Sequence, residues 1–455
     1  MKKKHHYFLF FVSAFILSFN MGSFAHNRNI DSLIILITND KSDTNKVNHL
    51  ITLCNEYRNI GDYNNSLSYG NKALQIASLI SNRKYKASSY NNIGNIYYSI
   101  GKYPLALTNY FASLKINEVL KNKKDIAGAY LNIGIIYYYQ NNFPEALKNY
   151  YASLNISKEI GDKGGIAISL TNIGLVYDDP DNYPEALKNY FAALKLYVEI
   201  QDKKGIADSY NNIGRIYNSL GNYSDALKMY SASLKLNQEI GSKYGAAFSY
   251  HNMGNIYWNQ VNFPELKQTG KFPNEVKPIV PIDLLNRSFK NYQAALNIRM
   301  ESGDKQGSIE SFIGLGHVQM NLKKLKEAEE YLKKALNLSY EIKSKEWIKE
   351  SYSRLEELDS MQSNWKAAYD HHKLYVRYRD SIHSEEFEKE SIQNIINFDF
   401  EKNIASSKAE AEKKNIIDNA NNKKKLFELI LGACVMILAI VLARYMYRSR
   451  RTSKK

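Results

Sequence analysis

Apolar and small residues recur along this chain at helical spacing, and the whole pattern repeats every 40 residues. An aliphatic residue and a glycine, with a tyrosine three positions after the glycine, mark each repeat. The pairs are Ile93-Gly94, Ile133-Gly134, Ile173-Gly174, Ile213-Gly214 and Met253-Gly254, and the tyrosines are Tyr97, Tyr137, Tyr177, Tyr217 and Tyr257. A fixed period of this size predicts a stacked array, because one unit cannot bury its apolar face without a neighbour.

Each unit predicts two helices joined by a turn. In one unit, Tyr90, Ile93, Gly94 and Tyr97 form a helical stripe, residues 101–104 interrupt it, and Ala106, Tyr110, Ser113 and Leu114 resume it. Pro104, Pro144, Pro184 and Pro264 recur where the second helix is expected to begin, a position where a missing N–H costs nothing. We expect Gly94, Ala106 and their equivalents where two helix backbones approach too closely for a large side chain.

The motif Tyr90-x2-Ile93-Gly94-x2-Tyr97 with Ala106-x3-Tyr110 resembles the tetratricopeptide repeat (TPR), whose signature is W-x2-L-G-x2-Y followed by A-x3-F. Tyrosine replaces the tryptophan and the phenylalanine, and each unit is longer than the usual ~34 residues. The resemblance implies an all-α fold, a right-handed α-solenoid of the longer-helix subclass. Several members of that subclass bind peptides or serve as sensor input modules.

Counting by register predicts about eight units over residues 47–388, the first near 47–86 and the last at 349–388. The eighth keeps Trp365, Ala368 and His372 in register but lacks the glycines, so we interpret it as a capping unit. The spacing between Gly254 and Gly316 grows to 62, which places an insertion at 267–287 within the sixth unit. This proline-containing insertion is either a tolerated surface loop or a loop that contacts a ligand or partner.

The two ends of the chain predict that the protein is exported and anchored in a membrane. Residues 1–25 have the features of a signal peptide: Lys2 to Lys4, an apolar run from Tyr7 to Phe19, and the small residues Ser23 and Ala25. Residues 426–447 are apolar except near their edges and are long enough for one transmembrane helix. The alternative is a buried core helix, although no later repeat is available to pack against it.

Charge predicts the orientation. The last twelve residues contain six basic residues and no acid: Arg444, Arg448, Arg450, Arg451, Lys454 and Lys455. The tail at 448–455 is therefore expected in the cytoplasm and the repeats outside it, in the periplasm of a double-membraned bacterium. The formal net charge of +15 does not imply nucleic acid, because the leader, the tail and Lys423 to Lys425 account for most of it.

Residues 389–425 contain neither glycine nor proline and are rich in helix formers, so we predict a helical stalk. A broken apolar stripe that includes Ile392, Ile395 and Phe398 is compatible with a coiled coil and a homodimer, but clean heptads are absent, and dimerisation stays open. Cys54 lies in the first unit and Cys434 in the membrane segment, so these two cysteines are not expected to pair.

The sequence contains few residues in patterns typical of catalysis or cofactor binding. It contains no phosphate-binding loop, dinucleotide fingerprint, H-E-x-x-H, C-x-x-C or G-x-S-x-G motif, so we expect neither an enzyme nor a cofactor. His371 and His372 are adjacent and point to different faces of a helix, which favours a solvated pair over a metal site.

The predicted groove of the array carries a column of identical amides and two variable rows, and these are the candidate peptide-binding residues. The column is Asn92, Asn132, Asn172, Asn212 and Asn252, and the selected members of the rows are Asn95, Arg215, Asn255, Tyr98, Tyr138 and Trp258. An asparagine both donates and accepts, so a column of them can hold an extended peptide backbone without reading its sequence. The resemblance supports backbone capture, and the alternative is that each amide satisfies the backbone of a neighbouring repeat.

The whole layout resembles the input half of TPR sensor histidine kinases that are common in Bacteroidetes, without an output domain after the short tail. We therefore expect a membrane-anchored protein that binds a peptide or protein and acts as a receptor through a separate cytoplasmic partner. The alternatives are a tethered scaffold without signalling and a truncated sensor kinase. The sequence does not identify the ligand.

Overall fold

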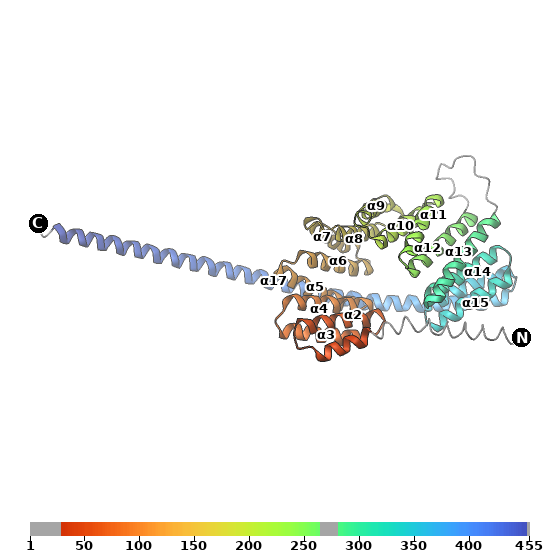
Figure 1. Ribbon diagram of the computed structural model, residues 1–455, viewed down its shortest axis with the longest axis horizontal. Coiled ribbons are helices and arrows are strands. Elements are labelled where there is room, and N and C mark those ends of the chain that lie inside the picture. Colours follow the sequence, from red (N-terminus) through yellow and green to blue (C-terminus); the bar gives the residue numbers. More distant parts are fainter. Residues whose placement is uncertain (1–28, 264–280, 453–455) are drawn as a thin grey trace. The chain divides into compact units, whose positions relative to one another are not determined.

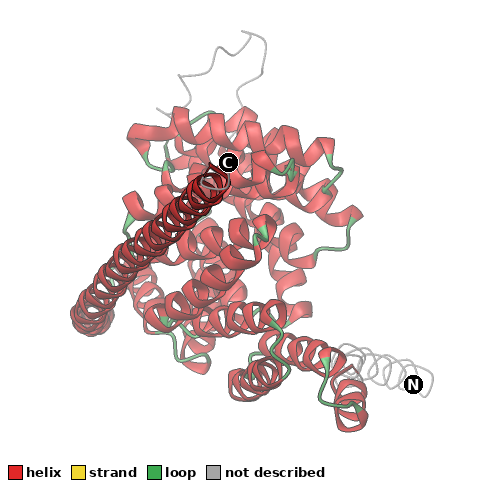
Figure 2. Ribbon diagram, turned by 90° about the vertical axis from the view of Figure 1, so that its left-hand side faces the viewer, coloured by secondary structure: helices red, strands yellow, loops and turns green. Residues whose placement is uncertain are grey.

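The computed structural model of the chain describes residues 29–263 and 281–452, and within these ranges every regular element is a helix (Figures 1 and 2). The predicted all-α class is confirmed, and consecutive helices pack in pairs as a solenoid requires. The signal peptide predicted at 1–25 lies outside the described residues. The chain divides into two units, Met1–Ser384 and Glu385–Lys455.

The repeats are helix pairs in which an even-numbered first helix is followed by an odd-numbered second helix. The first helices are α2 (Thr44–Asn59), α4 (Arg83–Ser99), α6 (Lys123–Tyr139), α8 (Lys163–Val176), α10 (Lys203–Ser219), α12 (Lys243–Asn262), α14 (Lys305–Asn321) and α16 (Lys345–Met361). The second helices are α3 (Tyr63–Leu79), α5 (Tyr103–Leu120), α7 (Phe143–Glu159), α9 (Tyr183–Glu199), α11 (Tyr223–Glu239), α13 (Pro281–Ser302), α15 (Leu325–Glu341) and α17 (Trp365–Thr452). A short helix, Asn29–Asn39, precedes them, and a 3-10 turn, Pro180–Asn182, precedes α9.

Local signals fix the ends of these helices. The side chains of Asn82, Asp162 and Ser242 accept the backbone N–H three residues further on, which caps a donor that the helix itself leaves unpaired. Pro104 stands in the first turn of α5, as its position predicts. Gly101 follows the end of α4 with a φ of +71°, a left-handed conformation that glycine adopts without strain.

A buried tyrosine of the second helix lies against the repeat glycine of the first helix. A methyl group placed on Gly94, Gly134 or Gly174 would meet the ring of Tyr110, Tyr150 or Tyr190 at 2.6–2.7 Å. The sequence correctly singles out these glycines but gives the wrong reason. An aromatic ring, rather than a second helix backbone, is the nearest neighbour.

Ion pairs join the two helices of five units, from α6 and α7 to α14 and α15. Lys163 near the start of α8 pairs with Glu199 at the end of α9, and Lys203 of α10 pairs with Glu239 of α11, each at 2.9 Å. The pairs recur with the repeat period, although their side chains are largely exposed. Each such surface pair contributes only ~0.2–1 kcal/mol, so they align the helix pairs more than they stabilise them.

Helices α12 and α13 pack against each other as the two helices of one unit, although the chain between them is long. The insertion predicted at 267–287 falls largely on residues 264–280, which lie outside the described residues. The rest of it is helical, because α13 begins at Pro281, where proline suits the first turn.

Helix α17 runs from Trp365 to Thr452 and includes the predicted stalk and membrane segment. Within it, Asn419–Arg444 is long and apolar enough to cross a membrane, and its described side chains are exposed. A single-pass anchor is compatible with this helix, which overlaps the segment predicted at 426–447. Cys54 is a buried free thiol, as expected from its isolation.

Two alanine substitutions in α6 test the ring-on-glycine packing. We expect Gly134→Ala to lower the free energy of unfolding by about 1–3 kcal/mol, because its methyl group would overlap the ring of Tyr150. Gly128→Ala is the matched control: no heavy atom lies within 4 Å of its new methyl group, and we expect a gain of about 0.5–1 kcal/mol. Urea unfolding followed by circular dichroism measures both, and equal effects would contradict the proposed role of the ring.

Candidate functional site

The first helices form the inner face of the array. Those of neighbouring units contact one another directly, as α2 does with α4, α6 with α8, and α12 with both α10 and α14. In the described part of the chain, second helices of neighbouring units make no contact of comparable extent. The array therefore bends toward its first helices, and side chains on their free side share one inner face.

The structure places the five column asparagines in different environments. Asn92 is 9% exposed and donates to the carbonyl of Ser88, and Asn172 donates in the same way to Ile168. Asn132 donates to the side chain of Asn91 in the preceding first helix, at 3.0 Å.

The last two members of the column differ from these. Asn212 is half-buried, and the Nδ2 of Asn252 is buried without a partner among the described residues. The column therefore contains amides that hold the repeat together and one amide, Asn252, whose Nδ2 has no partner among the described residues.

Asn95, Arg215 and Asn255 are the candidate residues of the first variable row. Two of them, Asn95 and Asn255, are hydrogen-bonded to tyrosines of the second helices. Asn95 accepts from the hydroxyl of Tyr110 at 2.8 Å, and Asn255 accepts from that of Tyr292 at 2.6 Å. These contacts orient the two amides on the inner face while using one of their acceptor sites.

Arg215, also in this row, donates to the buried carboxylate of Asp178 at 2.8 Å. The hydroxyl of Tyr190 donates to the same carboxylate at 3.1 Å. Asp178 belongs to the second variable row, because it stands 40 residues after Tyr138. Its ion pair with Arg215 therefore links the two rows across two units and fixes Arg215 within the framework of the array.

The aromatic candidates fall into two groups. Tyr98 and Tyr138 each pack against Tyr139, and Tyr138 also contacts Phe143, so these rings form a cluster across two units. Trp258 stacks on His317 with ring centroids 5.6 Å apart. The Nε1 of Trp258 is buried without a hydrogen-bond partner among the described residues.

A pocket of about 410 Å³ opens on the inner face between α12, α14 and α16, and we call it the inner pocket. Its lining includes His251 and Asn255 of α12, Tyr292 of α13, Glu310, Gly314 and His317 of α14, and Glu346, Trp347 and Glu350 of α16. The lining residues from Tyr292 onward all follow the insertion of the sixth unit, and only His251 and Asn255 precede it.

Gly314 explains why the pocket is there. With the offset of 62 residues, it stands at the column position that Asn252 occupies one unit earlier. A methyl group on Gly314 would meet the ring of Tyr292 at 2.8 Å, so this glycine both lets the ring approach and leaves a gap in the amide column. The sequence alone could have predicted this gap from the register of Gly314. The insertion, which lengthens the spacing from 40 to 62 residues, obscured that register.

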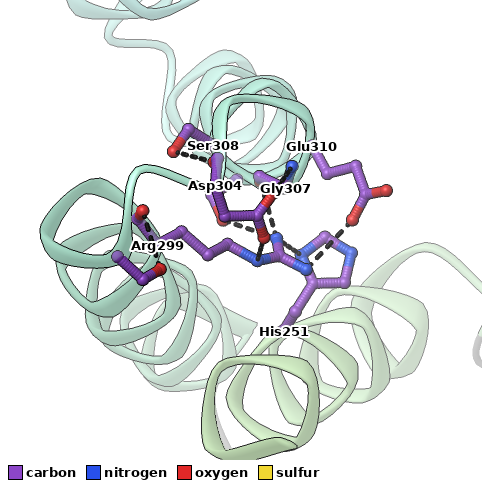
Figure 3. Close-up of polar contacts among 8 residues, drawn as sticks. His251, Arg299, Asp304, Gly307, Ser308 and Glu310 are labelled. Carbon is purple, nitrogen blue, oxygen red and sulfur yellow. Dashed lines mark hydrogen bonds and ion pairs between the residues drawn. The ribbon is translucent and has the colours of Figure 1, made fainter. Parts of the chain in front are cut away.

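Arg299 of α13 is buried behind this wall and holds it together (Figure 3). Its guanidinium donates to the carboxylate of Glu310 at 3.0 Å, to the hydroxyl of Ser311 at 2.8 Å and to the carbonyl of Gly307 at 2.7 Å. The ring of His251 from α12 lies 3.4 Å from the same group. Sequence reasoning did not select this arginine, which occupies a position held by Asn237 in the preceding unit.

Burial keeps both histidines of the inner pocket neutral. Burial, assisted by Arg299, lowers the pKa of His251 to about 3, and burial, assisted by Arg354, lowers that of His317 to about 4. Burial raises the pKa of Glu310 although Arg299 opposes the shift. The Nε2 of His317 is buried and has no hydrogen-bond partner among the described residues.

A second pocket, of about 310 Å³, lies between α4, α5 and α6 and includes Asn91 and Asn132 in its lining. It is present because Gly128 has no side chain where the following units place Ile168 and Asp208. Its buried Asn117 leaves its Oδ1 without a partner among the described residues.

His371 and His372 contact different partners, and the side chain of His372 is about half exposed while that of His371 is more buried. His371 lies 2.6 Å from the carboxylate of Asp359 and His372 lies 3.0 Å from that of Glu356, because both carboxylates line the facing side of α16. The described residues contain no group of three or more His, Cys, Asp or Glu side chains arranged to hold a metal ion.

Family comparisons agree with the repeat pattern. Models described as tetratricopeptide repeat match residues 48–118, 125–197, 205–265 and 309–341, which together are more than half of the chain. The chain therefore belongs to the tetratricopeptide repeat family. A comparison with curated protein sequences gives no match.

Solved structures with a similar fold include other repeat proteins. The apo form of the quorum sensor NprR from B. thuringiensis is 16% identical, with a TM-score of 0.51 over 77% of this chain and 92% of that one. A signal transduction ATPase with a tetratricopeptide repeat sensor from Pyrococcus horikoshii is 13% identical, with a TM-score of 0.49 over 77% and 55%. At these identities the likeness concerns the fold alone.

The neutral histidines predict a pH dependence of stability. Because their pKa values are lower in the folded chain than the ordinary 6.5, unfolding takes up protons below about pH 6.5. We expect the free energy of unfolding to fall as the pH drops from 6.5 toward 4, by up to about 1.4 kcal/mol per pH unit for each histidine. Glu310, whose pKa is raised, opposes this trend at the acidic end.

The variant His317→Asn, which installs the residue that Asn255 supplies one unit earlier, removes one of the two contributions. Its midpoint of urea unfolding should depend less steeply on pH between 6.5 and 5 than that of the unmodified chain. An unchanged slope would show that His317 does not titrate with folding.

Proposed function

We propose that this chain is a membrane-anchored binding protein whose repeats lie outside the cytoplasm and take up a peptide or protein partner on the inner face. It acts as a receptor that passes the binding event to a separate cytoplasmic partner, and it catalyses no reaction. The proposal extends the family assignment, which concerns the repeats, to the whole chain.

The observation that carries this proposal is unused hydrogen-bonding capacity on the inner face. The Nδ2 of Asn252, the Nε1 of Trp258 and the Nε2 of His317 are all buried on α12 and α14 without partners among the described residues. Each unsatisfied buried polar atom costs about 1–3 kcal/mol. A ligand whose binding opens the surface locally and supplies partners for these atoms recovers that cost, which favours binding at this place over binding elsewhere on the array.

Helix α17 supports the receptor part of the proposal. It is one helix from Trp365, in the last repeat, to Thr452, beyond the candidate membrane span Asn419–Arg444. A continuous helix is stiff and can carry a rotation or a shift along its axis. The basic residues after the span favour a cytoplasmic tail under the positive-inside rule, so the repeats belong on the opposite side.

Fusion of a reporter enzyme after Ser384 tests the topology. We expect a reporter that is active only in the periplasm to be active there, because the leader and the basic tail both place this position outside the cytoplasm. A fusion of the same reporter after Lys455 is the control and should be inactive. Activity of a cytoplasm-specific reporter at Ser384 would refute the proposed orientation.

Alanine substitution of the inner-face amides tests the binding surface. The partner is first recovered by cross-linking to the full-length chain in its source cells and is then titrated. We expect the double variant Asn172→Ala and Asn212→Ala to bind it more weakly by about 1–3 kcal/mol, if each lost hydrogen bond counts for ~0.5–1.5 kcal/mol.

The matched control is Asn109→Ala in α5. Like Asn172, Asn109 is an exposed amide that donates to the carbonyl four residues earlier, but it belongs to a second helix. Its affinity for the partner should be unchanged. If the double variant loses thermal stability and keeps its affinity, the amide column serves the framework and not the ligand.

A further inference from the structure

The inner pocket presents acidic groups to any guest. Among the described residues, its lining contains three carboxylates, Glu310, Glu346 and Glu350, and no lysine or arginine. The bases that neutralise these carboxylates are Arg299, Lys349 and Arg354, and none of them lines the pocket. A guest therefore meets the acceptor side of each ion pair.

In each of the three carboxylates, the neighbouring base donates to only one of the two oxygens. Glu310 receives Arg299 on Oε2, Glu346 receives Lys349 on Oε1, and Glu350 receives both the Nε and an Nη of Arg354 on Oε1. An ionised carboxylate accepts at two oxygens, so the second oxygen of each group keeps acceptor capacity after the pairing.

The other walls suit the same kind of guest. Tyr292 and Trp347 also line the pocket, and the faces of aromatic rings attract cations. His317 also lines the pocket, with its buried Nε2 unpartnered among the described residues. Because His251 and His317 are neutral, neither ring adds a positive charge that would repel a cation.

We propose that the inner pocket binds the cationic side chain of an arginine or lysine in the peptide or protein partner. This inference rests on the proposed function, because it assigns part of that partner to one place on the inner face. Arginine fits the pocket better than lysine, since its planar group has five donors for several acceptors and stacks on aromatic rings.

Single capped amino acids test the proposal on the full-length chain in detergent. The probes are N-acetyl-arginine amide, N-acetyl-lysine amide and N-acetyl-citrulline amide, the last of which has nearly the shape of arginine without its charge. Tryptophan fluorescence reports binding, because Trp347 lines the pocket and Trp258 stacks on His317. Substitution of the third tryptophan, Trp365→Phe, leaves only these two tryptophans to emit.

We expect saturable binding of the arginine and lysine probes up to ~10 mM and at least about ten-fold weaker binding of the citrulline probe. Glu346→Gln should weaken the arginine probe by about three- to ten-fold without unfolding the chain, because its side chain is 58% exposed. Glu329→Gln is the matched control: Glu329 also pairs with a lysine of its own helix but lies on the second helix α15. It should leave binding unchanged.

Equal affinities for arginine and citrulline, no saturable binding, or equal effects of the two glutamate substitutions would each overturn the inference. Its failure is distinguishable from failure of the proposed function. A partner whose affinity depends on Asn172 and Asn212 but not on Glu346 would leave the inner face as a binding surface and remove the cation from this pocket.

Discussion

The contact between a buried tyrosine and a helical glycine is the constraint on which the packing of the central units depends. The ring of Tyr110 lies on Gly94, that of Tyr190 on Gly174 and that of Tyr292 on Gly254, and no side chain larger than hydrogen fits between them. The ring sets the distance between the two helices of a unit, while its hydroxyl reaches the inner face. There it donates to Asn95, Asp178 or Asn255, so in these three units one tyrosine connects the core to the surface proposed to bind a ligand. Burial raises the pKa of these tyrosines, which keeps each phenol protonated and able to donate.

The repeats share one backbone framework, and they differ in the side chains at a few equivalent positions of the repeat. These side chains decide where pockets and charged groups lie. The position of Gly128 is filled by Ile168, Asp208, Phe248, Glu310 and Glu350 in the later units. A missing side chain there opens a pocket in the early units, whereas a glutamate places a carboxylate in the wall of the inner pocket in the late units. Arg299 is a second residue that distinguishes one unit from the others. A buried guanidinium requires hydrogen-bond partners, and Glu310, Ser311 and the carbonyl of Gly307 all lie within 3.0 Å of it. Removing one member of such a buried group leaves the others uncompensated, so these positions are expected to change together.

Much of the fold is accessible from the sequence, because the same local signals recur in each repeat. Period, caps and prolines predict the helix pairs and their order, and the matched family agrees with them. The candidate site is less accessible for two reasons. A column of asparagines can be recognised from spacing, yet whether an amide faces a ligand or returns to its own helix depends on competition with a nearby carbonyl, as Asn92 and Asn172 illustrate. The inner pocket depends on Arg299 and Gly314, whose register is hidden by the longer spacing between the sixth and seventh units.

The position of α16 connects the inner pocket to the rest of the molecule. Glu346, Trp347 and Glu350 line the pocket from one side of this helix, while Tyr352 and Asp359 on the same helix contact Tyr378 and His371 of α17. The second helix of the last repeat is thus also the start of the helix that contains the candidate span. A packed core permits discrete rearrangements more readily than gradual deformation, so a ligand that displaces α16 would alter its register against α17.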